Sequence, residues 1–187
     1  MANSSNNIIT RGLRGKIGGM LVFKQLEGKT VVGNVPIHSH SLPSDNQKKV
    51  KLKFQHAVIY ALKVINDPDL KAEYYKGRKP RQSAYNIAIA DFFNAPKIES
   101  IDLTAYTGLA GQVIVVTATD DFKVKEVTVA IYNSDGTLVE KGNAVESTSN
   151  LLWTYTTTAA NDHQLGDKIV VQASDIPGNM TESQQDL

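Results

Sequence analysis

Histidines in the N-terminal half offer the clearest metal-binding chemistry in this sequence. His38 and His40 are two residues apart, so both imidazoles face the same side of an extended segment. His56 could add a third nitrogen ligand if the chain folds back, and Zn²⁺ would require all three nitrogens at about 2.1 Å. Nothing in the sequence fixes that approach. A divalent metal bound by these residues is one hypothesis, solvated histidines are the favoured alternative, and no other cofactor is expected.

Basic residues recur every three or four positions in the same region, which would align them on one face of a helix. The face comprises Lys49, Lys53, His56, Tyr60 and Lys63, and the nearby basic residues are Arg78, Lys79 and Arg81. Such a surface could bind the phosphate backbone of a nucleic acid. A solvated basic face opposite the helix core is the simpler interpretation.

Acidic residues dominate the expected loop ends of the C-terminal half. They are Asp120, Asp121, Asp162, Asp167 and Asp175. Calcium takes about six to eight oxygen ligands, and loop carboxylates can supply them. No EF-hand loop is present, so these residues indicate a supply of calcium ligands rather than a defined site.

Enzyme signatures are missing from the sequence. It contains no His-Glu-x-x-His, no Gly-x-Ser-x-Gly and no kinase or Rossmann pattern. The complete lack of cysteine excludes thiolate catalysis, disulfides and thiolate metal sites. We therefore expect a protein that is not an enzyme. An active site assembled in space from scattered acidic, basic and histidine residues remains an alternative.

The N-terminal half has the pattern of an α+β region, a β-hairpin followed by about three helices. The hairpin is expected over 20–25 and 29–35, joined around Gly28. A long helix should begin at the capping pair Ser44 and Gln47, followed by helices over 68–76 and from Ser83 to before Pro96. The apolar stripe of the long helix is Val50, Phe54, Ala57, Ala61 and Ile65, and it predicts Phe54, Ala61 and Ile65 in the core.

The C-terminal half changes to the two-residue alternation of β-strands. About seven short strands are expected, over 98–103, 112–119, 124–132, 137–141, 151–157, 168–174 and 180–184. Val113, Val115 and Thr117 should share one face of their strand. This pattern predicts an all-β antiparallel sandwich with Val115, Val129, Trp153 and Val171 in its core.

Charge divides the 187-residue chain near its middle. Residues 1–96 hold fifteen Lys and Arg against six Asp and Glu, whereas residues 97–187 hold five against thirteen. We expect a basic domain over 1–95 and an acidic domain over 96–187. Opposite charges at the two ends favour head-to-tail self-association or docking on a charged protein surface.

Two segments of the acidic half resemble known domains. The first segment is Val115-Val116-Thr117-Ala118-Thr119-Asp120-Asp121, and the second is Val170-Val171-Gln172-Ala173-Ser174-Asp175-Ile176-Pro177-Gly178-Asn179. They are similar to early and closing strands, respectively, of bacterial immunoglobulin-like domains. The resemblance implies an immunoglobulin-like sandwich over about 97–187, with little implication for function. The first half resembles small uncharacterised bacterial proteins that begin with Gly-x-x-Gly and a Val-Phe-x-Gln strand.

These features favour a structural or interaction protein. One setting is a phage or contractile injection particle, in which the chain would be a cargo, plug or decoration. An exported toxin or effector and a nucleic-acid-binding protein are the alternatives. No secretory signal is visible, so we expect synthesis in the cytoplasm and export within a particle. No apolar run approaches the roughly 18 residues of a membrane span.

Overall fold

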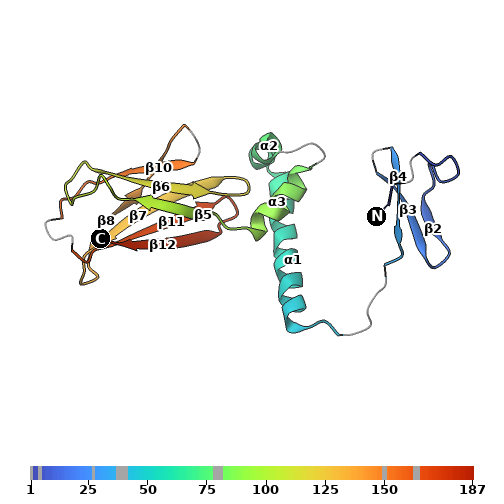
Figure 1. The fold of residues 1–187 in the computed structure, drawn as a ribbon, viewed down its shortest axis with the longest axis horizontal. Coiled ribbons are helices and arrows are strands. Elements are labelled where there is room, and N and C mark those ends of the chain that lie inside the picture. Colours follow the sequence, from blue (N-terminus) through green and yellow to red (C-terminus); the bar gives the residue numbers. More distant parts are fainter. Residues whose placement is uncertain are drawn as a thin grey trace. The chain divides into compact units, whose positions relative to one another are not determined.

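The computed structural model describes residues 2–3, 6–26, 28–36, 42–77, 82–148, 151–161 and 165–187. These residues form three helices and three antiparallel sheets, an α+β fold that is mostly β (Figure 1). The chain divides into two compact units, Met1–Ser44 and Asp45–Leu187. The boundary expected near residue 95 lies inside the second unit, between its last helix and its first strand.

The first unit is a small sheet with strand order β1-β4-β3-β2. Its strands are β1 (Ala2–Asn3), β2 (Gly15–Ile17), β3 (Leu21–Leu26) and β4 (Lys29–Asn34). β3 and β4 form the predicted hairpin, in which Leu26 pairs with Lys29 and Gly28 has a φ of 76°. Phe23 and Thr30 are the buried residues in the described part of this unit, so its core is very small.

Three helices open the second unit at the positions that the sequence predicts. They are α1 (Asp45–Asn66), α2 (Pro68–Lys76) and α3 (Ala84–Phe93). The Asp67 carboxylate caps α2 by accepting hydrogen bonds from two backbone amides, and Pro68 occupies the first turn. The Ser83 hydroxyl caps α3 by accepting from the amide of Asn86.

The helices share a core built on one side of the second half of α1. Ala57, Ala61 and Val64 are the fully buried residues of α1. The prediction that Phe54 lies in the core is wrong, because its side chain is 49% exposed, with its ring centroid 6.4 Å from that of Phe93. Ile65 is only partly buried. A helix of 22 residues is about 33 Å long and one of 10 residues about 15 Å, so α1 extends past α3.

The remainder of the second unit forms two antiparallel sheets. The first has the order β5-β6-β10-β9, and the second β12-β11-β7-β8. The strands of the first sheet are β5 (Lys97–Asp102), β6 (Val113–Thr119), β10 (Leu152–Thr156) and β9 (Val145–Glu146). Those of the second are β7 (Val124–Tyr132), β8 (Leu138–Asn143), β11 (Lys168–Asp175) and β12 (Met180–Asp186). All seven predicted strands are present, and β9 is additional.

The two sheets bury their inner faces in one hydrophobic core. Val129, Trp153 and Val171 lie in it, as the sequence predicts. Val115 does not, because β6 buries the alternate residues Ile114, Val116 and Ala118. Both faces of β6 carry aliphatic residues, so alternation alone does not decide which face turns inward.

None of the helices in the described ranges has the length and apolar character required to cross a lipid bilayer.

Candidate functional site

Three aspartates meet where the helices contact the β-strands of the second unit. Asp91 comes from α3, Asp120 from the turn after β6, and Asp175 from the end of β11. One carboxylate oxygen of each lies within 4.8 Å of one oxygen of each of the other two. Asp91 and Asp175 are each 1% exposed, and Asp120 is partly buried. We call these three residues the aspartate cluster.

Each carboxylate is oriented by the element that carries it. Asp91 belongs to the buried face of α3, three or four residues after Ile87 and Ala88. Oδ2 of Asp120 accepts hydrogen bonds from the amides of residues 122 and 123, at 3.3 and 2.9 Å. Oδ1 of Asp175 accepts from the amides of residues 178 and 179, at 2.8 and 2.6 Å. Both loop aspartates are therefore held by the turns that follow their own strands.

Two oxygens of the cluster are buried without a hydrogen-bond partner among the described residues. They are Oδ1 of Asp91 and Oδ1 of Asp120. The ion pairs found in the described part of the chain do not include any of the three aspartates. A buried acceptor that has lost water and gained no donor is unfavourable, so this arrangement favours a proton or a cation at the cluster.

Burial raises the pKa of Asp91 to about 7. The hydrogen bond from Tyr74 opposes this increase, and the charges of Asp120 and Asp175 add to it. Burial also raises the pKa of Asp175, against the hydrogen bonds that it accepts from Asn179 and Gly178. The cluster consequently binds a proton more readily than isolated aspartates do.

The C-terminal end of α3 adds further negative potential. Asn179 donates its side-chain amide toward the backbone oxygens of Asp91, Phe92 and Asn94, each at 3.3 Å. The same amide donates to Oδ2 of Asp175 at 2.7 Å. The last carbonyls of a helix carry a partial negative charge, so the helix end and the aspartates both favour a positive ligand.

Other contacts hold the helices against the β6–β7 turn. The rings of Tyr74 and Phe122 stack with their centroids 4.4 Å apart. Lys123 forms an ion pair with Glu73 at 2.8 Å, and Asn94 donates a hydrogen bond to Asp121. The aspartate cluster therefore lies in a packed junction within the second unit.

Of the three residues predicted as a histidine metal site, the structure describes His56 alone. His56 is exposed on α1. His38 and His40 lie outside the described residues, so that prediction is untested.

The predicted basic face divides into two groups. Lys49, Lys53 and Lys63 are exposed on α1, and Lys53 donates to the backbone oxygen of Phe93 at 3.1 Å. Tyr60 instead points toward the helical core, where its hydroxyl lies 2.8 Å from that of Tyr74. The other members of the predicted face, Arg78, Lys79 and Arg81, lie outside the described residues.

The calcium hypothesis identified two of the three clustered aspartates. Asp120 and Asp175 were both among its predicted ligands, whereas Asp167 lies apart and accepts a hydrogen bond from Asn161. Asp162 lies outside the described residues. Sequence reasoning missed Asp91, although an acidic residue on the apolar face of α3 is itself a signal that something compensates its charge.

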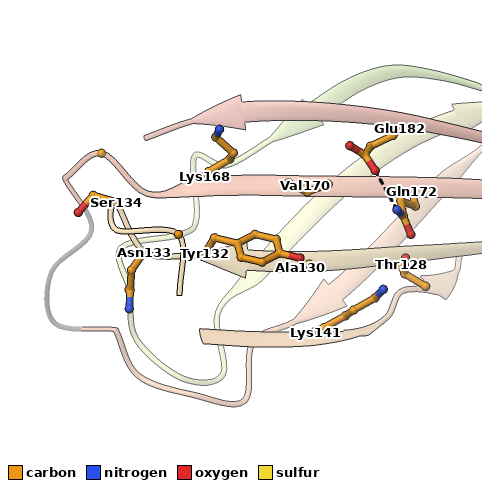
Figure 2. Close-up of a pocket in the computed structure, with 12 residues that line it drawn as sticks. Thr128, Ala130, Tyr132, Asn133, Ser134, Lys141, Lys168, Val170, Gln172 and Glu182 are labelled. Atoms are coloured by element: carbon orange, nitrogen blue, oxygen red, sulfur yellow. Dashed lines mark hydrogen bonds between the residues drawn. The ribbon is translucent and has the colours of Figure 1, made fainter. Parts of the chain in front are cut away.

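A shallow cavity of about 310 Å³ lies on the outer face of the second sheet (Figure 2). Its side chains include Tyr132, Lys141 and Lys168, and Gln172 donates a hydrogen bond to Glu182 at 2.8 Å. Tyr132 on β7, and Lys168 and Gln172 on β11, alternate with the buried residues of these strands. The surface is mixed in charge, and no buried ionisable group faces it among the lining residues that the structure describes.

No family model matches the chain, and no curated protein matches it. Two solved structures are similar to part of it, each at 15% identity. CopC from Methylosinus trichosporium OB3b has a TM-score of 0.35 and covers 48% of this chain and 87% of its own. An engineered protein has a TM-score of 0.33 and covers 58% of this chain and 28% of its own. Both are β-rich, and likeness at this level assigns the chain to no family.

Proposed function

We propose that this chain is a non-enzymatic interaction protein that docks on other proteins through the first half of α1. The observation that carries the proposal is the exposure of this half: every residue from 45 to 56 is exposed. Val50 is 62% exposed and Leu52 54%. Apolar side chains grouped on the surface of one helix are typical of a protein contact.

We further propose that the two larger sheets form an immunoglobulin-like sandwich that carries this helix. The order β5-β6-β10-β9 corresponds to strands A, B, E and D of such domains, and β12-β11-β7-β8 to G, F, C and C′. The sequence resemblance of 115–121 and 170–179 supports the same assignment. Trp153 lies on β10 rather than on the third strand, and cysteines are absent, so the antibody-type core is not expected.

The chemistry of the docking helix indicates an acidic partner. Lysines surround its exposed apolar residues at positions 48, 49, 51 and 53. The partner that we propose is the acidic half of another copy, in which residues 97–187 have five basic and thirteen acidic residues. That half exposes apolar residues of its own beside β9 and β10, namely Val145, Leu151 and Leu152. Opposite charges guide the contact, and apolar burial stabilises it.

Copies joined in this way would stack head to tail. We propose a phage or contractile injection particle as the setting for such stacks, with the chain as cargo, plug or decoration and the particle as its route of export. The support for this setting is the charge pattern and the resemblance to immunoglobulin-like domains, which often serve as structural modules.

Sedimentation velocity of the full chain tests the docking surface. At about 0.05 M NaCl the sedimentation coefficient should rise with protein concentration, and at about 0.5 M NaCl it should remain that of a monomer. Val50→Asp with Phe54→Asp should abolish the association, whereas Ile8→Asp, at an exposed apolar residue of the first unit, should not. A monomer at every concentration in low salt would contradict the proposal. Tight binding of duplex DNA through the same surface would instead favour the nucleic-acid alternative.

A further inference from the structure

We propose that Asp91, Asp120 and Asp175 together bind one Ca²⁺ ion, which joins α3 to the strands of the second unit. The inference is independent of the docking function and concerns a different part of the molecule. Ca²⁺ binds oxygens at about 2.4 Å, so two ligands of one ion are at most about 4.8 Å apart. One oxygen from each aspartate meets this limit with respect to the other two. The three carboxylates can therefore share a single ion without rearrangement of the backbone.

A second observation points to a ligand at the same place. Asp91 is almost completely buried, and its Oδ1 has no hydrogen-bond partner among the described residues. The Oδ1 of Asp120 is buried in the same unpartnered state. The other oxygens of these carboxylates accept hydrogen bonds, from Tyr74 to Asp91 and from the turn amides to Asp120. Asp91 and Asp120 thus each have one oxygen without a donor, whereas both oxygens of Asp175 accept hydrogen bonds, so Asp175 would share a bonded oxygen with the ion.

Charge favours a divalent cation over a proton. A single proton shared by two carboxylates would leave two negative charges beside the C-terminal end of α3, which adds to the negative potential. Ca²⁺ would neutralise two of the three charges and contact all three residues at once. The cation that lies nearest in sequence to the cluster, Lys123, is already paired with Glu73.

The donor set and its irregular geometry favour calcium among divalent ions. The cluster supplies only oxygen, and the chain contains no cysteine, so zinc is a poor match. Mg²⁺ demands near-ideal octahedral geometry, whereas Ca²⁺ accepts irregular carboxylate arrangements. Asp120 also lines a cavity of about 400 Å³ together with Asn94 and Asp121. In the proposed site, water supplies the further oxygens that Ca²⁺ requires.

Thermal unfolding of the full chain, freed of metal by a chelator and held near pH 8, tests the site. CaCl₂ should raise the Tm in a saturable manner, with an apparent Kd of about 10⁻⁵ to 10⁻³ M, and MgCl₂ should have a much smaller effect. Asp120→Asn should weaken Ca²⁺ binding about tenfold or more. Without calcium, the same variant should unfold at an equal or higher temperature than the wild type, because one repelling charge is gone.

Asp135→Asn is the matched control, because Asp135 is an exposed turn aspartate that accepts hydrogen bonds from Thr137. It should retain the full response to calcium. Asp91→Asn is a second variant of the site. If this substitution of a buried residue prevents folding, Asp120→Asn still tests the site, because Asp120 is partly exposed. A wild-type Tm that calcium leaves unchanged, an equal response to magnesium, or an undiminished response in Asp120→Asn would each overturn the proposal. If the chain binds calcium but does not self-associate, the result would support the calcium site and contradict only the docking function.

Discussion

The hydroxyl of Tyr74 donates a hydrogen bond to Oδ2 of Asp91 in the interior of the second unit. Tyr74 is fully buried, and its hydroxyl also lies 2.8 Å from that of Tyr60. Burial, together with the bond to Asp91, raises the pKa of Tyr74 far above its ordinary value, so the phenol stays protonated and acts as a donor. The bond fixes one oxygen of Asp91 in the helical core and leaves the other for the aspartate cluster.

Replacement of Tyr74 by phenylalanine should destabilise the second unit. The change removes the donor to Oδ2 of Asp91 and leaves a second acceptor of this residue unpartnered, which costs about 1–3 kcal/mol. Urea unfolding followed by circular dichroism near neutral pH measures the loss. Tyr132→Phe, on the outer face of the second sheet, is the control and should change the free energy of unfolding far less. Equal stability of the two variants would show that the Tyr74 bond is not important for the fold.

Stability of the metal-free protein should fall as pH rises from about 4 to about 7. Folding raises the pKa of Asp91 from 3.8 to about 7, so the folded state binds more protons than the unfolded state within this window. The stabilisation is fully present below the unfolded pKa and is lost as pH rises through the folded one. Urea titrations in the presence of a chelator measure the slope. Asp91→Asn should flatten it, and a wild-type stability that increases across the window would contradict the assignment.

Replacement of Trp153 by alanine should cost about 3–5 kcal/mol, because the indole is 4% exposed in the core shared by the two sheets. Differential scanning calorimetry of the variant should show a large fall in Tm. Leu138→Ala is the control, since this residue is 53% exposed on β8 and should change the Tm little. Similar losses in both variants would indicate that Trp153 is not a core residue.

Gly77→Ala should loosen the contact between α2 and the β6–β7 turn. A Cβ atom at this position would come within 2.5 Å of the Phe122 ring, which stacks on Tyr74. The backbone of Gly77 has an ordinary φ of −81°, so the expected cost of about 1–3 kcal/mol comes from the clash and not from backbone strain. In a Phe122→Ala background the same substitution should be nearly neutral. A cost that persists in that background would contradict the contact.

The positions of the helices and strands could be predicted because their periodicity and capping residues are local signals. Pro68 and Ser83 mark where α2 and α3 begin, and alternation marks β7 and β11. The set of buried residues was predicted less well, since burial depends on which other element packs against a helix or strand. Phe54 belongs to an apolar stripe, but it lies beside Phe93, the last residue of α3, and stays 49% exposed.

The aspartate cluster could likewise be predicted only in part, because it depends on contacts between distant segments. Asp120 and Asp175 could be selected as calcium ligands because strand ends carry the loop carboxylates. Their partner Asp91 is almost 30 residues away from the nearer of them and belongs to a helix. Only the packing of α3 against the β6–β7 turn brings the three together, and no local pattern encodes that contact.

Terbium luminescence tests the calcium site most directly, because Tb³⁺ replaces Ca²⁺ at oxygen sites and is sensitised by nearby phenol rings. The Tyr74 hydroxyl is bonded to Asp91, so Tb³⁺ held by the cluster would lie close to this ring. Excitation of tyrosine in the full chain should produce Tb³⁺ emission that Ca²⁺ displaces, that Asp120→Asn strongly reduces, and that Asp135→Asn preserves. Emission that is absent in the wild type, or that Asp120→Asn leaves unchanged, would contradict calcium binding by the aspartate cluster.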